Sequence, residues 1–253
     1  MHFFRSFLAS FALVAFVFPA VAQEVTVGEP PNTPVKGVIE LFTSQGCSSC
    51  PPADTLLKTL SDDPSIIALS LPVDYWNYLG WKDTFASPRN TERQRNYART
   101  RGDGAIYTPQ AVINGLTPVN GSSKEAIQSA IEETSKTGGP GQVAVRFWQE
   151  RNTLNFALGA EQPGHRTRDA TIWLGVVQMS GVVPVKEGEN AGKTLTYTNI
   201  VHELIPIGIW KGQAMQVQLP RAAMMQADVQ KVVVLVQEGK SGPIIGATMA
   251  GLW

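Results

Sequence analysis

The two cysteines of the chain lie in one short motif, Cys47-Ser48-Ser49-Cys50. The apolar run of residues 38–42 precedes the motif as a buried strand would, and residues 53–60 follow it with leucines spaced as on one helix face. A disulfide between positions 47 and 50 closes almost no loop, so it removes little entropy from the unfolded chain. The pattern therefore favours a reactive centre, between a strand and a helix, over a structural cross-link.

Position at a helix start predicts different roles for the two cysteines. Unpaired N–H groups and the partial positive charge of a helix N-terminus lower the pKa of a nearby thiol. We therefore expect Cys47 to be partly exposed and partly ionised, and to attack a disulfide of a partner protein. Cys50, more deeply buried, would then resolve the mixed disulfide. Pro51 disfavours helical geometry in the residue before it, which predicts a helix beginning only at Pro51 and a less activated Cys47 on a capping loop.

Two other uses of the cysteines stay open. Copper or zinc binding needs further ligands, and the histidines left after export, His165 and His202, lie far along the chain. Cu(I) can accept two thiolates, so a Cu(I)-binding or delivery protein remains an alternative. A non-catalytic binding protein with a permanently closed disulfide is the other. The sequence predicts no cofactor and offers no set of metal ligands.

The first 22 residues are predicted to be a signal peptide. Arg5 supplies a basic start, residues 7–18 form an apolar core, and Ala20-Val21-Ala22 is a small-x-small cleavage pattern before Gln23. The apolar core is too short to span a bilayer. We expect a protein exported to the periplasm or beyond the cell, where disulfides persist, with a retained N-terminal anchor as the alternative.

Charge and hydropathy narrow the expected partners. The sequence holds 21 basic and 21 acidic residues, which gives no electrostatic case for binding nucleic acid. No stretch after the signal is uninterrupted enough for a membrane helix. The predicted partners are thiols and disulfides of other proteins, and the oligomeric state is not predicted.

The segment after the signal predicts an α/β unit over residues 23–137. Residues 66–71 form a second buried strand, which with the first strand and helix implies a parallel pair. Ser87 and Pro88 start a helix that runs to about residue 101, and Ser123 caps another that ends near residue 136. A strand opens at Thr108-Pro109.

Residues 138–141, Gly-Gly-Pro-Gly, are the strongest linker signal in the chain. After them the apolar residues alternate as in strands, for example Val143, Val145 and Phe147. The sequence therefore predicts a smaller all-β, sandwich-like domain over residues 142–253.

The order strand, CxxC, helix, strand and later Thr-Pro is similar to the thioredoxin fold. In particular, the run from Phe42 to Asp54 (FTSQGCSSCPPAD) resembles a secreted bacterial thioredoxin-like family of unknown function, over roughly residues 37–250. The resemblance implies a thioredoxin-like α/β domain followed by the β domain. It also implies that Pro109 is a cis-proline against the disulfide and that the Thr108 backbone pairs with a substrate chain. The function it favours is thiol-disulfide exchange, in a direction that the motif does not set.

Glu40 has two interpretations under this resemblance. Thioredoxins carry a buried acid six positions before the first cysteine as a proton acceptor, and Glu40 lies seven before Cys47. A one-residue slip turns a strand side chain to the other sheet face, unless the turn at Gln45-Gly46 absorbs it. A proton-transfer role and a structural role therefore both stay open.

Three further groups of side chains have two interpretations each. The aromatic residues of positions 75–81 either form an apolar docking surface or cover a core edge. The arginines of the helix from Pro88 either attract an acidic partner or form a solvated face. Asp54, at the start of the helix after Cys50, most simply complements the helix dipole.

Overall fold

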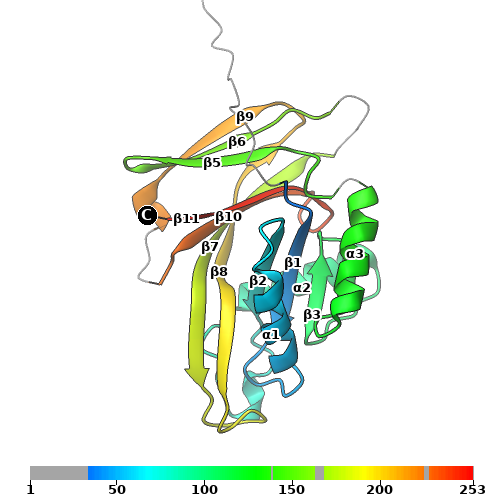
Figure 1. Ribbon diagram of the computed structural model, residues 1–253, viewed down its shortest axis with the longest axis vertical. Helices are drawn as coiled ribbons and strands as arrows, with labels where there is room; N and C mark the ends of the chain where they lie inside the picture. Colours follow the sequence, from blue (N-terminus) through cyan, green and yellow to red (C-terminus); the bar gives the residue numbers. More distant parts are fainter. Residues whose placement is uncertain (1–33, 138, 163–167, 225–227, 253) are drawn as a thin grey trace, which may run out of the picture.

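The computed structural model describes residues 34–137, 139–162, 168–224 and 228–252, so the predicted signal peptide, residues 1–22, lies outside the described residues. Within these ranges the chain forms an eight-stranded mixed sheet, a three-stranded sheet and three α-helices (Figure 1). None of these helices combines the length and apolar character that crossing a membrane requires.

The first half of the chain alternates strands and helices. Its elements are β1 (Gly37–Thr43), α1 (Pro51–Leu60), β2 (Ile66–Pro72), the 3-10 turn η1 (Asn77–Leu79), α2 (Pro88–Arg101), β3 (Gln110–Ile113), β4 (Thr117–Asn120) and α3 (Lys124–Lys136). The second half is built from strands: β5 (Val145–Glu150), β6 (Thr153–Leu158), β7 (Ala170–Pro184), β8 (Thr194–Trp210), β9 (Met215–Pro220), the 3-10 turn η2 (Arg221–Met224), β10 (Lys231–Glu238) and β11 (Ile244–Gly251).

Local signals fix the ends of α2 and α3. The Ser87 hydroxyl accepts a hydrogen bond from the Arg89 N–H, Pro88 occupies the first turn, and α2 stops at Gly102 in a left-handed conformation. The Ser123 hydroxyl caps α3 in the same way. Both predicted helices are confirmed within one or two residues of their expected bounds.

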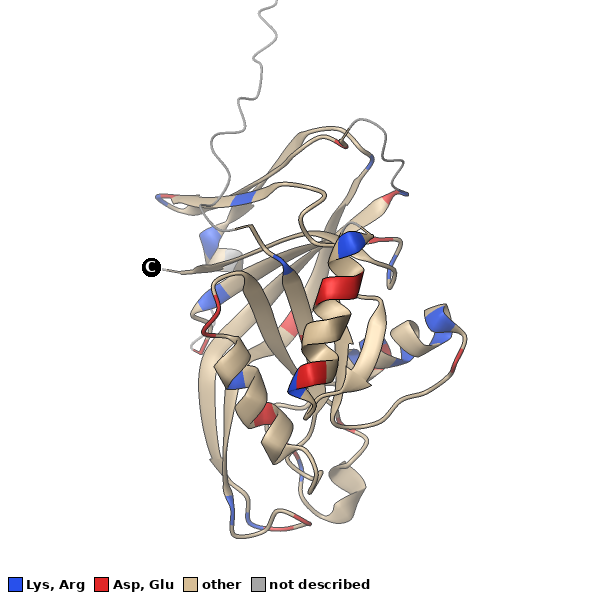
Figure 2. Cartoon of the chain, turned by 45° about the vertical axis from the view of Figure 1, so that its right-hand side comes forward, with Lys and Arg blue, Asp and Glu red and all other residues tan. Residues whose placement is uncertain are grey.

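Strand β1 lies inside the large sheet and is buried on both faces. It runs parallel to β2 and antiparallel to β3. Ile39 and Leu41 pack against α1 and α3, whereas Val38 and Phe42 face the side that α2 covers. Figure 2 marks charged residues on both α1 and α3; those of α3 are exposed, whereas α1 exposes Lys58 and buries Asp54. Each helix also buries an apolar stripe, Ala53 with Leu57 in α1 and Ile127 with Ala130 in α3.

The prediction of a thioredoxin-like α/β domain followed by a separate small β domain is wrong. The large sheet has the strand order β11-β10-β7-β8-β2-β1-β3-β4, so strands from both halves of the chain share it. The junction is the parallel pairing of β2 with β8 at Ser70 and Ile200, and the Asn199 amide donates a hydrogen bond to the Ala68 carbonyl. The protein is mostly β, with three helices in the described ranges. The residue boundaries 23–137 and 142–253 stay a prediction.

The predicted linker also belongs to this architecture. Gly141 bridges Gly246, and the Val143 N–H donates a hydrogen bond to the Ile245 carbonyl. Beyond it, the three-stranded sheet β5-β6-β9 packs its apolar face on the β7, β10 and β11 end of the large sheet, with Phe156 and Trp210 fully buried between them.

Candidate functional site

The cysteine motif occupies the turn between β1 and α1. The Cys47 N–H donates to the Ser44 carbonyl at 3.2 Å, and the Cys50 N–H donates to the Cys47 carbonyl at 3.2 Å. Cys50 is the residue before the first turn of α1, and its backbone is helical although Pro51 follows. The predicted helix start at Pro51 is confirmed, while the expected loss of helical geometry at Cys50 is wrong.

Cys47 and Cys50 form a disulfide with a Cα–Cα distance of 5.4 Å. Both residues have 0% exposure, so the prediction of a partly exposed Cys47 is wrong. The two serines between them are exposed, and the Ser49 hydroxyl lies 3.4 Å from the Cys47 sulfur. The outer edge of the motif therefore reaches the surface, while its sulfurs are covered.

A segment from the second half of the chain, called the cover below, binds the backbone of the motif. Residues 185–193, the hairpin tip between β7 and β8, extend to the loop between β1 and α1 at the lower end of Figure 1. The buried Asn190 amide donates to the Gln45 carbonyl at 3.0 Å and to the Cys47 carbonyl at 2.9 Å. A Glu189 carboxylate oxygen accepts the Ser48 N–H at 3.1 Å. Hydrogen bonds from the Ser48 hydroxyl and N–H lower the pKa of Glu189.

The predicted prolyl bond is confirmed as cis and lies beside the start of α1. The Thr108–Pro109 peptide is cis, and a Cβ added at Gly121 would meet both Pro109 Cβ, at 3.2 Å, and Ala53 Cβ, at 3.3 Å. The Trp76 indole N–H donates to the Thr108 hydroxyl at 2.7 Å. Because a Cβ on Gly46 would lie 3.1 Å from Trp76 Cβ, this indole connects the prolyl peptide to the turn before Cys47.

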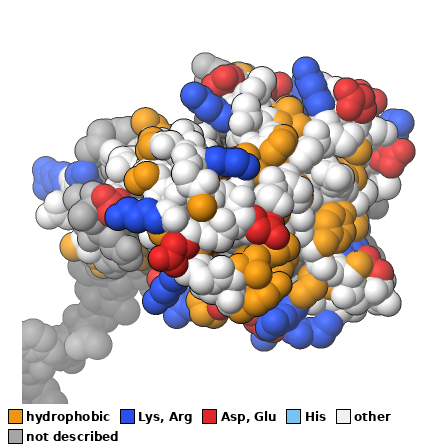
Figure 3. Space-filling view, turned by 90° about the horizontal axis from the view of Figure 1, so that it is seen from below, with side chains coloured by type: hydrophobic (Ala, Val, Ile, Leu, Met, Phe, Trp, Pro, Cys, Tyr) orange, Lys and Arg blue, Asp and Glu red, His pale blue; other side chains and the backbone are white. Residues whose placement is uncertain are grey.

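The end of the molecule that carries the hairpin tip displays apolar side chains. Seen from below, hydrophobic groups gather near the middle of the surface, with charged groups around them (Figure 3). Tyr78 is 79% exposed and Tyr107 is also exposed, whereas Trp81 is half-buried and donates to the Gln45 side chain at 2.8 Å. Trp81 thus supports the motif, whereas Tyr78 faces solvent, and the docking role of the aromatic segment stays a prediction.

Asp83 holds the turn that leads into the motif. It is almost fully buried, and its carboxylate accepts hydrogen bonds from the backbone N–H groups of Gln45 (2.8 Å), Phe85 (2.8 Å) and Ala86 (3.1 Å). Burial raises the pKa of Asp83, and these hydrogen bonds oppose that rise.

Asp54 is buried beside the same turn, and the prediction that it simply complements the helix dipole missed this. It is 4% exposed, and neither carboxylate oxygen has a hydrogen-bond partner. The pKa of Asp54 is raised to about 8. Burial is the largest cause, and the Asp83 charge adds to the rise. The neighbouring Thr43 hydroxyl lowers the pKa, although it forms no hydrogen bond of normal geometry with the carboxylate. The Tyr197 hydroxyl of β8 is also buried without a partner, and burial followed by the charges of Asp54 and Asp83 raises its pKa.

We expect this buried carboxyl to make stability fall with pH. The pKa of Asp54 is raised in the folded state, so the folded chain binds more protons than the unfolded chain between the ordinary value of 3.8 and about 8. Its stabilising contribution is complete below 3.8 and is lost as pH rises through about 8. Asp54→Asn should therefore raise the free energy of unfolding by about 1 kcal/mol or more at pH 8, and by less at pH 4.

Urea unfolding of the oxidised protein at both pH values measures this difference. The control is Asp62→Asn, which changes an exposed carboxylate just beyond the other end of α1. A stability change in Asp54→Asn that is the same at both pH values contradicts the expectation.

Glu40 lies on the α2 face of the sheet, opposite α1. It is fully buried, and the Arg93 guanidinium donates to its two carboxylate oxygens at 2.5 and 3.1 Å, while the Tyr97 hydroxyl also donates to it. Gln237 of β10 accepts from Arg93 at 3.2 Å. Burial lowers the pKa of Arg93, but the charge of Glu40, the Tyr97 hydroxyl and the hydrogen bond to Glu40 together outweigh that effect, so the pKa stays above its ordinary range. This network favours the structural interpretation of Glu40, and it shows that Arg93 is no part of a solvated face.

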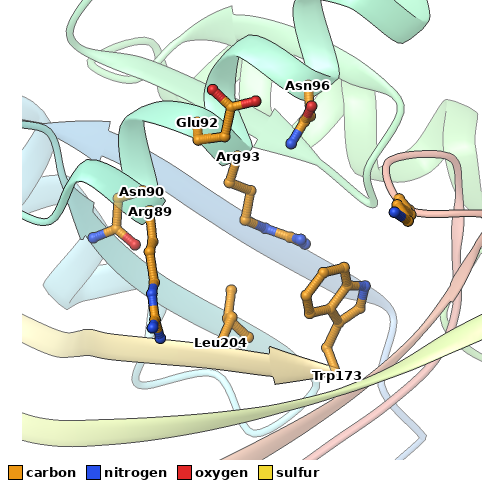
Figure 4. A pocket seen from close by; sticks show the side chains of 8 residues that line it. Arg89, Asn90, Glu92, Arg93, Asn96, Trp173 and Leu204 are labelled. Atoms are coloured by element: carbon orange, nitrogen blue, oxygen red, sulfur yellow. The ribbon is translucent and has the colours of Figure 1, made fainter. Parts of the chain in front are cut away.

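A pocket of about 210 Å³ opens beside α2 on this same face. In Figure 4, Arg89 and Arg93 extend from α2 toward Leu204 of β8 and Trp173 of β7. The arginines already have partners: Arg93 binds Glu40, and Arg89 pairs with Glu203. The pocket therefore supports no particular ligand.

Metal ligation has little support in the described part of the chain. No three His, Cys, Asp or Glu side chains cluster there as metal ligands would. His202 is hydrogen-bonded to the Gln178 side chain at 2.9 Å, and His165 lies outside the described residues.

Comparison with known proteins connects the chain to a family. Residues 38–237 match the family described as "Protein of unknown function (DUF1223)". The X-ray crystal structure of protein AGR_C_4864 from Agrobacterium tumefaciens is similar, with 33% identity, coverage of 87% of this chain and 95% of that chain, and a TM-score of 0.76. HBP35 of Porphyromonas gingivalis shares the fold at 14% identity, over 87% of this chain and 76% of that chain, with a TM-score of 0.59. No protein with a curated description matches.

Proposed function

We propose that the chain, which belongs to the DUF1223 family of proteins of unknown function, exchanges disulfides with the thiols of other proteins. The observation that carries this proposal is the disulfide between its only two cysteines, at the first turn of α1. A cross-link that closes so short a loop adds less stability than one that closes a long loop, whereas a helix N-terminus stabilises the thiolate that exchange requires. The same proposal locates the reaction outside the cytoplasm, after removal of the signal peptide.

The exchange proceeds through a mixed disulfide. A partner thiolate attacks the Cys47 sulfur, the Cys47–Cys50 bond breaks, and Cys50 leaves with the bonding electron pair as a thiolate. A second partner thiolate then attacks the partner sulfur of the mixed disulfide and expels Cys47 as a thiolate. The partner loses two electrons and becomes a disulfide, and the chain gains both. Run in reverse, Cys47 of the reduced chain attacks a partner disulfide and Cys50 resolves the mixed disulfide, so the partner is reduced and the Cys47–Cys50 disulfide forms again.

The partner chain would dock beside the prolyl peptide. Pro109 packs near Ala53 in the first turn of α1, and the exposed Tyr107 precedes Thr108. We assign to the Thr108 backbone the pairing with an extended partner segment, and to Pro109 the shaping of the groove. The exposed aromatic ring of Tyr78 offers a partner further apolar contact area.

Burial of both sulfurs requires the cover to move before a partner can attack. The contacts to be released are those of Glu189 and Asn190 with the motif backbone. The same burial favours a second candidate, a non-catalytic binding protein whose disulfide never opens.

Redox titration of the full mature chain in glutathione buffers tests the proposal. Thiol alkylation and mass measurement follow the redox state of the cysteine pair. We expect reversible two-electron reduction of the pair while the fold is retained, and turnover of insulin as a disulfide substrate. A pair that stays oxidised until the chain unfolds supports the non-catalytic candidate instead. Stoichiometric retention of Cu(I) by the reduced chain, without turnover of insulin, supports a Cu(I)-binding or delivery protein.

Loosening the cover should speed reduction. Asn190→Ala removes two hydrogen bonds to the motif, each worth about 1 kcal/mol, and should raise the rate of reduction by dithiothreitol by about tenfold or more. Asn152→Ala, which removes the same side chain from the exposed turn between β5 and β6, should leave the rate unchanged. An unaltered rate in Asn190→Ala would show that the hairpin tip does not limit access.

A further inference from the structure

Asp54 is the carboxylate that the fold buries without a partner. Glu40 is bound by Arg93, and Asp83 accepts three backbone N–H groups, whereas both oxygens of Asp54 lack any hydrogen bond. Among the described residues, no other aspartate or glutamate has a buried carboxylate oxygen without a partner. An unpaired buried carboxyl lowers the stability of the fold, and such groups often serve a function.

The spacing of Asp54 and Cys50 places the two residues on one face at the start of α1. Asp54 follows Cys50 by four residues, and its N–H donates to the Cys50 carbonyl at 3.1 Å. Residues four apart lie on one helix face, and helical side chains tilt toward the N-terminus. Asp54 also belongs to the buried side of α1, with Ala53 and Leu57. The Asp54 carboxyl is therefore expected on the helix face that Cys50 shares, pointing toward the N-terminal end of α1.

The surroundings of Asp54 favour its neutral form near neutral pH. The titratable groups that face it are Asp83, from the segment before α2, and Tyr197, from β8, with the Thr43 hydroxyl at the end of β1. Burial and the Asp83 charge bring the pKa of Asp54 to about 8, close to the ordinary thiol value of about 8.5. Groups with matched pKa values pass a proton in either direction with little cost.

We propose that Asp54 exchanges a proton with the buried Cys50 sulfur during each half of the disulfide exchange; this inference rests on the proposed function. On reduction, the Cys47–Cys50 bond breaks, Cys50 leaves with the electron pair, and its sulfur takes the proton of the Asp54 carboxyl. On oxidation, the Asp54 carboxylate takes the proton of the Cys50 thiol. The Cys50 thiolate then attacks Cys47 in the mixed disulfide and expels the partner thiolate. No charge is thereby stranded on the buried sulfur.

The test compares Asp54→Asn with Asp62→Asn in the full mature chain. We measure how fast Cys50 resolves the mixed disulfide that reduced protein forms with oxidised glutathione, at pH values on both sides of 8. Asp54→Asn should slow resolution by about tenfold or more below pH 8, and the difference should shrink at higher pH, where the thiol ionises unaided. Asp54→Glu should restore part of the rate, and alkylation of Cys47 should be unaffected.

Two results would overturn the inference. One is an Asp54→Asn profile that superposes on those of wild type and Asp62→Asn. The other needs no variant: in wild-type protein, the carboxyl carbon resonance of Asp54 should titrate at different pH values in the oxidised and reduced states, and identical titrations exclude proton exchange. If wild type itself is never reduced while folded, the proposed function fails; if wild type exchanges and Asp54→Asn matches it, only this inference fails.

Discussion

Cys47→Ala is expected to abolish insulin turnover completely. A single thiol at position 50 cannot form the intramolecular disulfide, so no electrons can be stored in or released from the chain. Cys50→Ala should instead stop after the first attack and accumulate a stoichiometric adduct through Cys47, because the resolving thiol is missing. Loss of the disulfide costs both variants the same loop entropy, about 2 kcal/mol, so folding cannot account for their different products.

Turnover assays and mass measurement of unreduced protein distinguish these variants. Asp62→Asn serves as the control, since Asp62 is exposed just beyond the far end of α1 and takes no part in the electron transfer. Full turnover by Cys47→Ala would show that the cysteine pair takes no part in the reaction. An adduct that forms only through Cys50 would reverse the assigned order of attack.

Glu40→Leu is expected to lower the free energy of unfolding by about 3–5 kcal/mol. The change leaves the Arg93 guanidinium buried without its carboxylate, and an uncompensated buried charge is strongly destabilising. The double variant Glu40→Leu, Arg93→Met should recover most of the lost free energy of unfolding, because an apolar pair of similar volume avoids the desolvation of both charges.

Urea unfolding measures these changes, with Glu203→Leu as the matched control. Glu203 pairs with the exposed Arg89, and surface ion pairs contribute only about 0–1 kcal/mol. A loss in Glu40→Leu no larger than in the control contradicts the structural role. Slower disulfide exchange at unchanged stability would return Glu40 to the proton-transfer role that the sequence left open.

Features set by neighbouring residues could be predicted from the sequence. Ser87 with Pro88, and Ser123, fixed the starts of two helices through capping hydrogen bonds within three residues. Pro51 and Pro52 placed the start of α1 after the cysteines. The Thr108–Pro109 bond is cis as the resemblance implied.

Features set by distant segments could not be predicted. The apolar alternation of residues 194–210 is the same whether that strand joins a separate sandwich or the edge of β2, so the pattern could not reveal the pairing of Ser70 with Ile200. For the same reason the sequence pattern could not show that the Asn190 amide donates a hydrogen bond to the Cys47 carbonyl. By sequence, Asp54 is an ordinary acid in a first helical turn; only the fold brings Asp83 and Tyr197, both distant in sequence, close enough to act on its charge.

The pairing of β2 with β8 has a practical consequence for anyone who trims the chain. A fragment ending at residue 137 would retain both cysteines but would lack the neighbour that occupies the β2 edge, leaving the Ala68 carbonyl and adjoining peptide groups open to other chains. It would also lack residues 185–193, so its sulfurs would react far more freely than those of the intact protein. Such a fragment would look more active and aggregate more readily, and both properties would belong to the truncation.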